Sequence, residues 1–150
     1  MNAQANRPLE GLYILIVEDS SVTALNTVRI LQERGGATVE ITSTLATAKE
    51  RLEAARFDMI ILDHGLGAAQ RGTDLALWMM YHTNERIRQI LRISYSGAEP
   101  ATIFQDVPIE AINTIFAAMH TKPIPLKELI ILLRDTAERH GKIQQTATML

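Results

Sequence analysis

Residues 12–17 read LYILIV and are followed directly by Glu18 and Asp19. A continuous apolar run of this length is typical of a central strand in a parallel sheet, because such a strand is buried on both faces. Residues 59–62 (MIIL) form a second run of the same kind, which ends at Asp63. The two runs predict the middle of a parallel sheet, with carboxylates placed where the strands end.

Outward from these two runs, strand-like and helix-like segments alternate along the chain. Further strands are expected at residues 38–42 (TVEIT), 90–95 (ILRISY) and 116–120 (FAAMH). Helices are expected from Ser20 or Ser21 to Gly35, from Ser43 or Thr44 to about Ala55, near Thr73–His82, within residues 98–116, and from Pro125 onward. This alternation predicts an α/β protein, in which a doubly wound five-stranded parallel sheet carries helices on both faces.

The length of 150 residues predicts one domain with short tails. We expect residues 1–10 to be a flexible N-terminal tail, residues 11–140 to form the domain, and residues 141–150 to be a C-terminal tail that begins at a helix-stopping glycine. In the first predicted helix, the apolar residues recur at helical spacing and predict one apolar face: Val22, Leu25, Val28 and Leu31.

The composition of the chain excludes several classes of function. The chain has 15 Lys and Arg against 17 Asp and Glu, a formal charge of −2, so it has no general basic field to hold nucleic acid. The absence of cysteine excludes disulfides, thiolate zinc sites and thiol catalysis. No apolar run approaches the roughly 20 residues of a membrane span, and residues 1–10 do not resemble a signal peptide. We therefore expect a cytoplasmic protein with no membrane or nucleic-acid partner.

Polar side chains follow the predicted strands at their carboxyl ends, where ligands bind in parallel α/β sheets. Glu18, Asp19 and Asp63 would converge there, and at an effective dielectric of 20 each close pair of carboxylates costs about 4 kcal/mol. Mg²⁺ would relieve this repulsion and screen an incoming phosphoryl group. Asp63 could then attack phosphorus and form an acyl phosphate. Lys122 and a serine hydroxyl from the fourth strand could hold the new phosphoryl oxygens.

Three segments, ILIVEDS (14–20), IILD (60–63) and TKP (121–123), occur in an order and spacing that resemble the receiver domains of two-component response regulators, the CheY-like superfamily. The resemblance covers about residues 11–140. The lead-in LEG (9–11) is also similar to the start of receiver domains in hybrid sensor kinases. The chain could thus be a stand-alone receiver or a piece of a hybrid kinase.

The resemblance implies the flavodoxin-like receiver fold and a role for each matching residue. Asp63 would be the phosphoacceptor, and Lys122 would pair with the phosphoryl group. The implied Mg²⁺ ligands are Glu18, Asp19, Asp63 and the backbone carbonyl of Gly65. For the switch hydroxyl we favour Ser96, because Ser96-Gly97 matches the family's hydroxyl residue followed by a small one; Ser94 is the alternative.

By the same resemblance, the protein would accept its phosphoryl group from a histidine kinase or a phosphotransfer protein and signal by conformational change through protein contacts. It would catalyse only its own phosphorylation and dephosphorylation. A homodimer could form through the fourth helix, fifth strand and fifth helix, or through apolar residues on the helix near Thr73–His82, where Leu77 and Tyr81 lie opposite Leu75 and Met79.

The sequence departs from the family in the loop after Asp63, where Leu66-Gly67 replaces the usual Met-Pro, and at Met119, where an aromatic residue is common. The altered loop, together with the segment 98–116 and its two prolines, favours one alternative: a receiver-like module that binds its partner independently of phosphorylation. A metal-dependent phosphatase is a weaker alternative, because that class needs a second carboxylate two residues after the nucleophile and this chain has Gly65 there.

Overall fold

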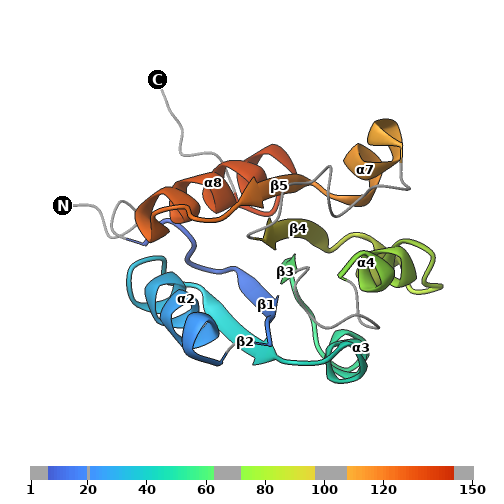
Figure 1. The fold of residues 1–150 in the computed structure, drawn as a ribbon, viewed down its shortest axis with the longest axis horizontal. Helices are drawn as coiled ribbons and strands as arrows, with labels where there is room; N and C mark the ends of the chain where they lie inside the picture. The colour runs from blue at the N-terminus through green and yellow to red at the C-terminus, as the bar shows by residue number, and fades with distance from the viewer. Residues whose placement is uncertain (1–6, 20, 63–71, 97–107, 144–150) are drawn as a thin grey trace.

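A computed structural model of the chain describes residues 7–19, 21–62, 72–96 and 108–143. The described part contains a five-stranded, fully parallel sheet in the order β2-β1-β3-β4-β5, which confirms the predicted fold class (Figure 1). This is the flavodoxin-like strand order, with β3 at its centre between β1 and β4. The strands are β1 (Tyr13–Val17), β2 (Thr38–Thr42), β3 (Met59–Leu62), β4 (Leu91–Ser96) and β5 (Ala118–Thr121).

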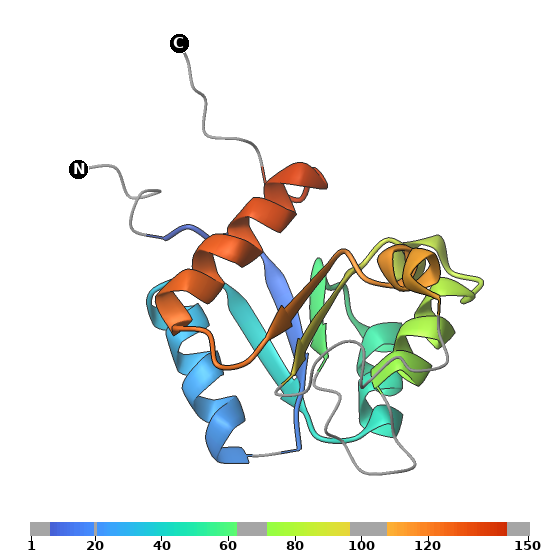
Figure 2. The ribbon, with the colours of Figure 1, turned by 45° about the horizontal axis from the view of Figure 1, so that its top comes forward.

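The helices cover both faces of the sheet, as expected, and Figure 2 shows the two layers from the side. They are α2 (Ser21–Glu33), α3 (Leu45–Ala54), α4 (Gly72–Met80), α5 (Glu85–Arg88), α7 (Ile109–Ile115) and α8 (Leu126–Arg139). Helices α2 and α8 pack on one face, and α3, α4, α5 and α7 pack on the other. The four-residue helix α5 was not predicted, because one turn leaves no periodicity to detect; Asn84 caps it by accepting the Arg86 N–H at 2.9 Å.

Alternate residues of the central strands enter opposite halves of the core. Leu15 and Ile60 pack toward α3 and α4, whereas Ile16 and Ile61 pack toward α2 and α8. All four are buried. Burial on both faces explains why these strands are continuous apolar runs rather than alternating ones.

The apolar face predicted for α2 is wrong in its first half. Val22 is 72% exposed and Leu25 is 62% exposed. The buried side chains are instead Ala24, Thr27 and Leu31, with Val28 partly buried. These positions follow the i, i+3, i+4, i+7 pattern of a single helix face, and the small residues at its start allow the helix to lie close to the sheet.

Both predicted tails are too long. Leu9 is fully buried in the core beside α2, and its N–H donates to the Gly35 carbonyl at 2.7 Å. At the other end, Gly141 stops α8 with φ +73°, as expected. The chain then turns back: the Lys142 N–H donates to the Ala137 carbonyl at 2.8 Å, and Ile143 packs against the core. The folded unit therefore extends beyond residues 11–140 on both sides.

We expect Gly35→Ala to lower the free energy of unfolding by about 3 kcal/mol, measured by urea denaturation. A Cβ at this position would overlap the Leu31 carbonyl oxygen and lie 2.9 Å from Cδ1 of Leu9, so the backbone must shift. The control is Gly141→Ala, where the new Cβ meets no atom within 4 Å and only the positive φ opposes it. That loss should be about 1 kcal/mol. Equal losses would contradict the packing explanation.

Candidate functional site

The carboxyl ends of β1, β4 and β5 bring three of the predicted residues together. Glu18 directly follows β1, Ser96 ends β4, and Lys122 directly follows β5. Ser96 lies opposite Thr121 in the β4–β5 register, and the Lys122 N–H donates to the Ser96 carbonyl at 2.8 Å. The sheet topology alone therefore places Lys122 beside the end of β4.

Glu18 and Lys122 form an ion pair across this edge, although 104 residues separate them in the sequence. Lys122 Nζ lies 3.1 Å from Glu18 Oε2. The Glu18 side chain is 7% exposed and that of Lys122 is 22% exposed. The backbone N–H of Glu18 donates to the Thr42 carbonyl, and this hydrogen bond fixes the backbone of Glu18 to the end of β2. A buried carboxylate needs such a compensating cation.

Tyr95 also lies beside Lys122, and the sequence did not single it out. Its ring is 8% exposed, and Lys122 Nζ lies 4.9 Å from the ring centroid. At that distance the ring face attracts the ammonium. The aromatic position that we considered from the sequence was Met119, on β5. The sequence feature that could have indicated Tyr95 is its position directly before Ser96, the hydroxyl residue at the end of β4.

The two serines of β4 differ in what lies beside them. Both are buried, at 4% exposure, and they share a face of the strand because they are two residues apart. Ser94 lies opposite Leu62 and Met119, inside the sheet. Ser96 lies at the edge, next to Lys122. This placement favours Ser96 as the hydroxyl of the site.

The predicted metal ligands are only partly described. Asp63 and Gly65 lie outside the described residues, while Glu18 is buried at the edge and Asp19 is exposed. Within the described ranges, no group of three or more carboxylate or imidazole side chains could hold a metal. The carboxylate oxygens of Glu18 and Asp19 are of the kind that Mg²⁺ binds, so this half of the predicted ligand set fits the ion chemically.

His120, on β5, lies near the site with its ring partly buried. Its Nε2 is buried and, within the described residues, has no hydrogen-bond partner. Burial lowers the pKa of His120 below its ordinary value of 6.5, because a charged imidazolium would lose solvation.

This shift predicts that the protein loses stability as the pH falls below 6.5. Above that pH the imidazole is neutral in both states and contributes no pH dependence. Below it, the unfolded chain binds a proton that folded His120 binds only at lower pH, so the free energy of unfolding decreases. Urea denaturation of His120→Gln at several pH values should give a flatter profile. The exposed His140→Gln control should keep the parental slope, and an unchanged slope in His120→Gln would contradict the prediction.

The outer side of α4 is only partly exposed. Leu75 and Met79 are buried, as predicted, and Tyr81, just beyond the helix, is 78% exposed. Leu77 and Trp78 pack partly against the core. On α8, Ile131 is 67% exposed. The expected dimer contacts on these surfaces stay predictions.

Solved structures with the same fold are numerous. The N-terminal domain of a response regulator/sensory box/GGDEF 3-domain protein from Carboxydothermus hydrogenoformans has a TM-score of 0.70 and 26% identity, and the match covers 87% of this chain and 97% of that one. A CheY-like response regulator receiver domain protein from Methanospirillum hungatei JF-1 has a TM-score of 0.73 and 22% identity, over 87% and 97% of the two chains. A CheY-like receiver domain from Methylobacillus flagellatus has a TM-score of 0.68 and 21% identity, over 83% and 98%.

No protein-family model matches the sequence, and no curated protein matches it significantly. The structural similarity nevertheless covers most of the chain. The protein therefore has the fold of the CheY-like receiver domains of response regulators, and the resemblance seen in the sequence is confirmed at the level of the fold. Within the described ranges, no helix is long and apolar enough to span a membrane.

Proposed function

We propose that the protein is a phosphoacceptor receiver domain of two-component signal transduction. The observation that carries the proposal is the meeting of Glu18, Ser96 and Lys122 at the carboxyl edge of a sheet with the receiver fold. Asp63, which directly follows β3 in the sequence, would attack the phosphorus of a phosphohistidine on a histidine kinase or phosphotransfer protein. The new O–P bond forms as the P–N bond breaks, and the imidazole nitrogen retains the bonding electrons.

Each residue near the acceptor has a role in holding the product. The Lys122 ammonium would pair with a phosphoryl oxygen, and the Ser96 hydroxyl would donate to another. Glu18 and Asp19 would hold Mg²⁺ together with Asp63 and the Gly65 carbonyl. When bound, the ion would neutralise part of the charge that gathers on the acceptor and the phosphoryl group. The protein would catalyse only its own phosphorylation and dephosphorylation.

The Glu18–Lys122 ion pair suggests how phosphorylation would change the structure of the protein surface. Lys122 lies at the junction between β5 and α8, so a phosphoryl group that draws its ammonium away from Glu18 would pull on both elements. A shift between two arrangements of α7, β5 and α8 would then be recognised by a partner protein in the cytoplasm.

The test is intact-mass analysis after incubation with acetyl phosphate, with Mg²⁺ and with a chelator. We expect one added phosphoryl group that requires Mg²⁺ and that hydroxylamine removes, as it does from an acyl phosphate. No addition from acetyl phosphate or from a panel of phosphorylated phosphotransfer proteins would overturn the proposal. That result would favour the alternative, a module that binds its partner independently of phosphorylation.

A further inference from the structure

A hollow lies at the amino-terminal ends of the strands, opposite the carboxyl ends that carry the site described above. It has a volume of about 790 Å³, within the range of small-molecule sites of about 300–1,000 Å³. Tyr13 and Thr38, the first residues of β1 and β2, line it together with Asp58, which directly precedes β3. At about 3.3 Å per residue, β1 alone separates Tyr13 from Glu18 by roughly 16 Å. The hollow is therefore not part of the candidate phosphoacceptor site.

The lining of this hollow is positively charged, although the whole chain has a formal charge of −2. Its cations are Arg51, Arg56, Arg86 and Lys142, and its carboxylates are Glu40 and Asp58. Two positive charges therefore remain in excess. A local excess of this sign in an acidic protein favours an anionic ligand.

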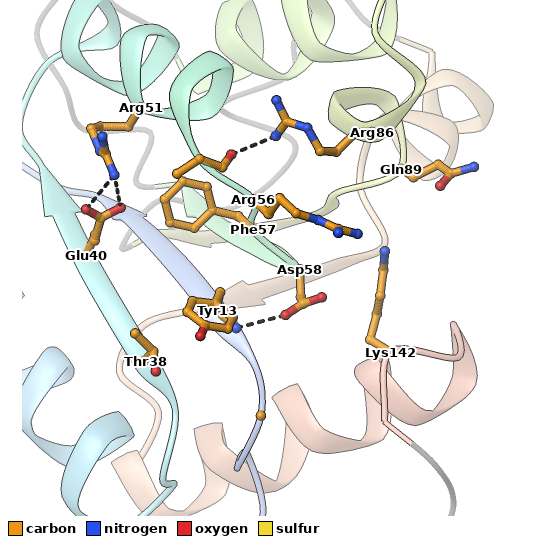
Figure 3. A pocket seen from close by; sticks show the side chains of 12 residues that line it. Tyr13, Thr38, Glu40, Arg51, Arg56, Phe57, Asp58, Arg86, Gln89 and Lys142 are labelled. Carbon is orange, nitrogen blue, oxygen red and sulfur yellow. Dashed lines mark hydrogen bonds and ion pairs between the residues drawn. The ribbon is translucent and has the colours of Figure 1, made fainter.

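Two of the arginines have structural partners. Arg51 Nη2 lies 2.9 and 3.2 Å from the two carboxylate oxygens of Glu40. Arg86 Nη1 donates to the carbonyls of Leu52 and Ala55, at 3.1 and 2.6 Å, and so holds the carboxyl end of α3. Figure 3 marks one of these two contacts with a dashed line at Arg86. These contacts form one wall of the hollow. Arg51 and Glu40 neutralise one another, whereas Arg86 keeps its charge because its partners are neutral carbonyls, so the excess of two positive charges belongs to Arg56, Arg86 and Lys142 once Asp58 is subtracted.

Arg56 and Lys142 are the cations available to a ligand. Among the described residues, neither side chain has a hydrogen-bond or ion-pair partner. Figure 3 shows the two side chains extending toward one another beside Asp58, whose carboxylate accepts the Tyr13 N–H at 2.9 Å. A guanidinium fork and an ammonium that converge on one point match the oxygens of a phosphate group.

The uncharged part of the lining combines the aromatic residues Tyr13 and Phe57 with the polar side chains of Thr38 and Gln89. Tyr13 is 52% exposed, so its ring is accessible to a ligand in the hollow, whereas Phe57 is buried. We propose that this hollow binds a phosphomonoester with a planar group, of the nucleoside monophosphate class, with its phosphate between Arg56 and Lys142 and its base against Tyr13. The proposal is independent of phosphorylation at Asp63.

The test is titration of ¹⁵N-labelled protein with AMP, GMP, CMP and UMP, followed by amide shifts. We expect at least one nucleotide to bind saturably and to shift the amides of Tyr13, Thr38 and Asp58, while those of Ser96 and Lys122 stay in place. The nucleoside of the nucleotide that binds, and inorganic phosphate, should each bind more weakly than that nucleotide. Shifts confined to Ser96 and Lys122, or no saturable binding at millimolar nucleotide, would overturn the proposal.

Matched variants test the named contacts. Arg56→Gln and Lys142→Gln should each weaken the binding nucleotide about tenfold, the loss expected for one charge-assisted hydrogen bond. Lys127→Gln, on the exposed side of α8, should bind like the parent, and so should Asp63→Asn. Tyr13→Ala should weaken the nucleotide more than inorganic phosphate. Parental affinity in both Arg56→Gln and Lys142→Gln would place the ligand elsewhere and overturn the proposal.

Discussion

Asp63→Asn should take up no phosphoryl group from acetyl phosphate, under conditions in which the parent gains one. The amide nitrogen and oxygen of asparagine are poor nucleophiles toward phosphorus, and the substitution replaces an anionic predicted ligand of Mg²⁺ by a neutral amide oxygen. The free energy of unfolding should not fall, since losing one of the three carboxylates that we expect to converge would relieve repulsion. Intact mass measures the first effect, and urea denaturation measures the second.

The matched control for this variant is Asp135→Asn. Asp135 is exposed on α8, where its carboxylate lies 3.1 Å from Arg139, and an exposed pair of this kind contributes little to stability. It should be phosphorylated like the parent. Parental uptake by Asp63→Asn would mean that another side chain is the acceptor, and the assignment of Asp63 would then be wrong.

The central strands were predictable because a strand that is buried on both faces is a continuous run of apolar residues in the sequence. The predicted strand at residues 38–42 coincides with β2, and the run at residues 59–62 coincides with β3. Helix boundaries followed from local chemistry as well. Thr44 caps α3 by accepting the Thr47 N–H at 3.1 Å, as a capping residue at that position should.

The faces of the helices were less predictable, because they depend on how closely two elements approach. Val22 and Leu25 are larger and more apolar than Ala24 and Thr27, yet Ala24 and Thr27 are the buried pair. Leu9 was assigned to a tail because a single apolar residue gives no period, but the carbonyl of Gly35 and the core beside α2 hold it in place. Contacts between distant segments decide such positions.

The candidate site was predictable in its residue types and less so in its contacts. Parallel strands end at one edge, so Glu18, Ser96 and Lys122 were expected to converge, and the structure places them together. The ion pair between Glu18 and Lys122 and the contact of Lys122 with the Tyr95 ring depend on side-chain geometry across strands. No local pattern encodes that geometry.

Those contacts make Lys122→Met the second variant with a large expected effect. Methionine keeps an apolar stem over the Tyr95 ring but removes the ammonium 3.1 Å from Glu18. Removing one partner of a buried ion pair costs about 3 kcal/mol, the lower end of the usual range, because part of the Lys122 side chain is exposed. We expect a folded protein with reduced stability in urea. Its amide spectrum should change little when phosphoryl donor is added, because no cation draws β5 and α8 toward the phosphoryl group.

The double variant Glu18→Gln with Lys122→Met separates the two effects of Lys122. Replacing the carboxylate as well removes the buried charge that the ammonium offsets, so most of the lost stability should return. The response to phosphoryl donor should not return, because the double variant lacks both the cation that would pair with the phosphoryl group and the Glu18 carboxylate that would hold Mg²⁺. If the double variant recovered the spectral response, Lys122 would serve only to balance Glu18, and its proposed role in holding the phosphoryl group would be wrong. If stability did not recover, the ion pair would not be the main contribution of Lys122 to the fold.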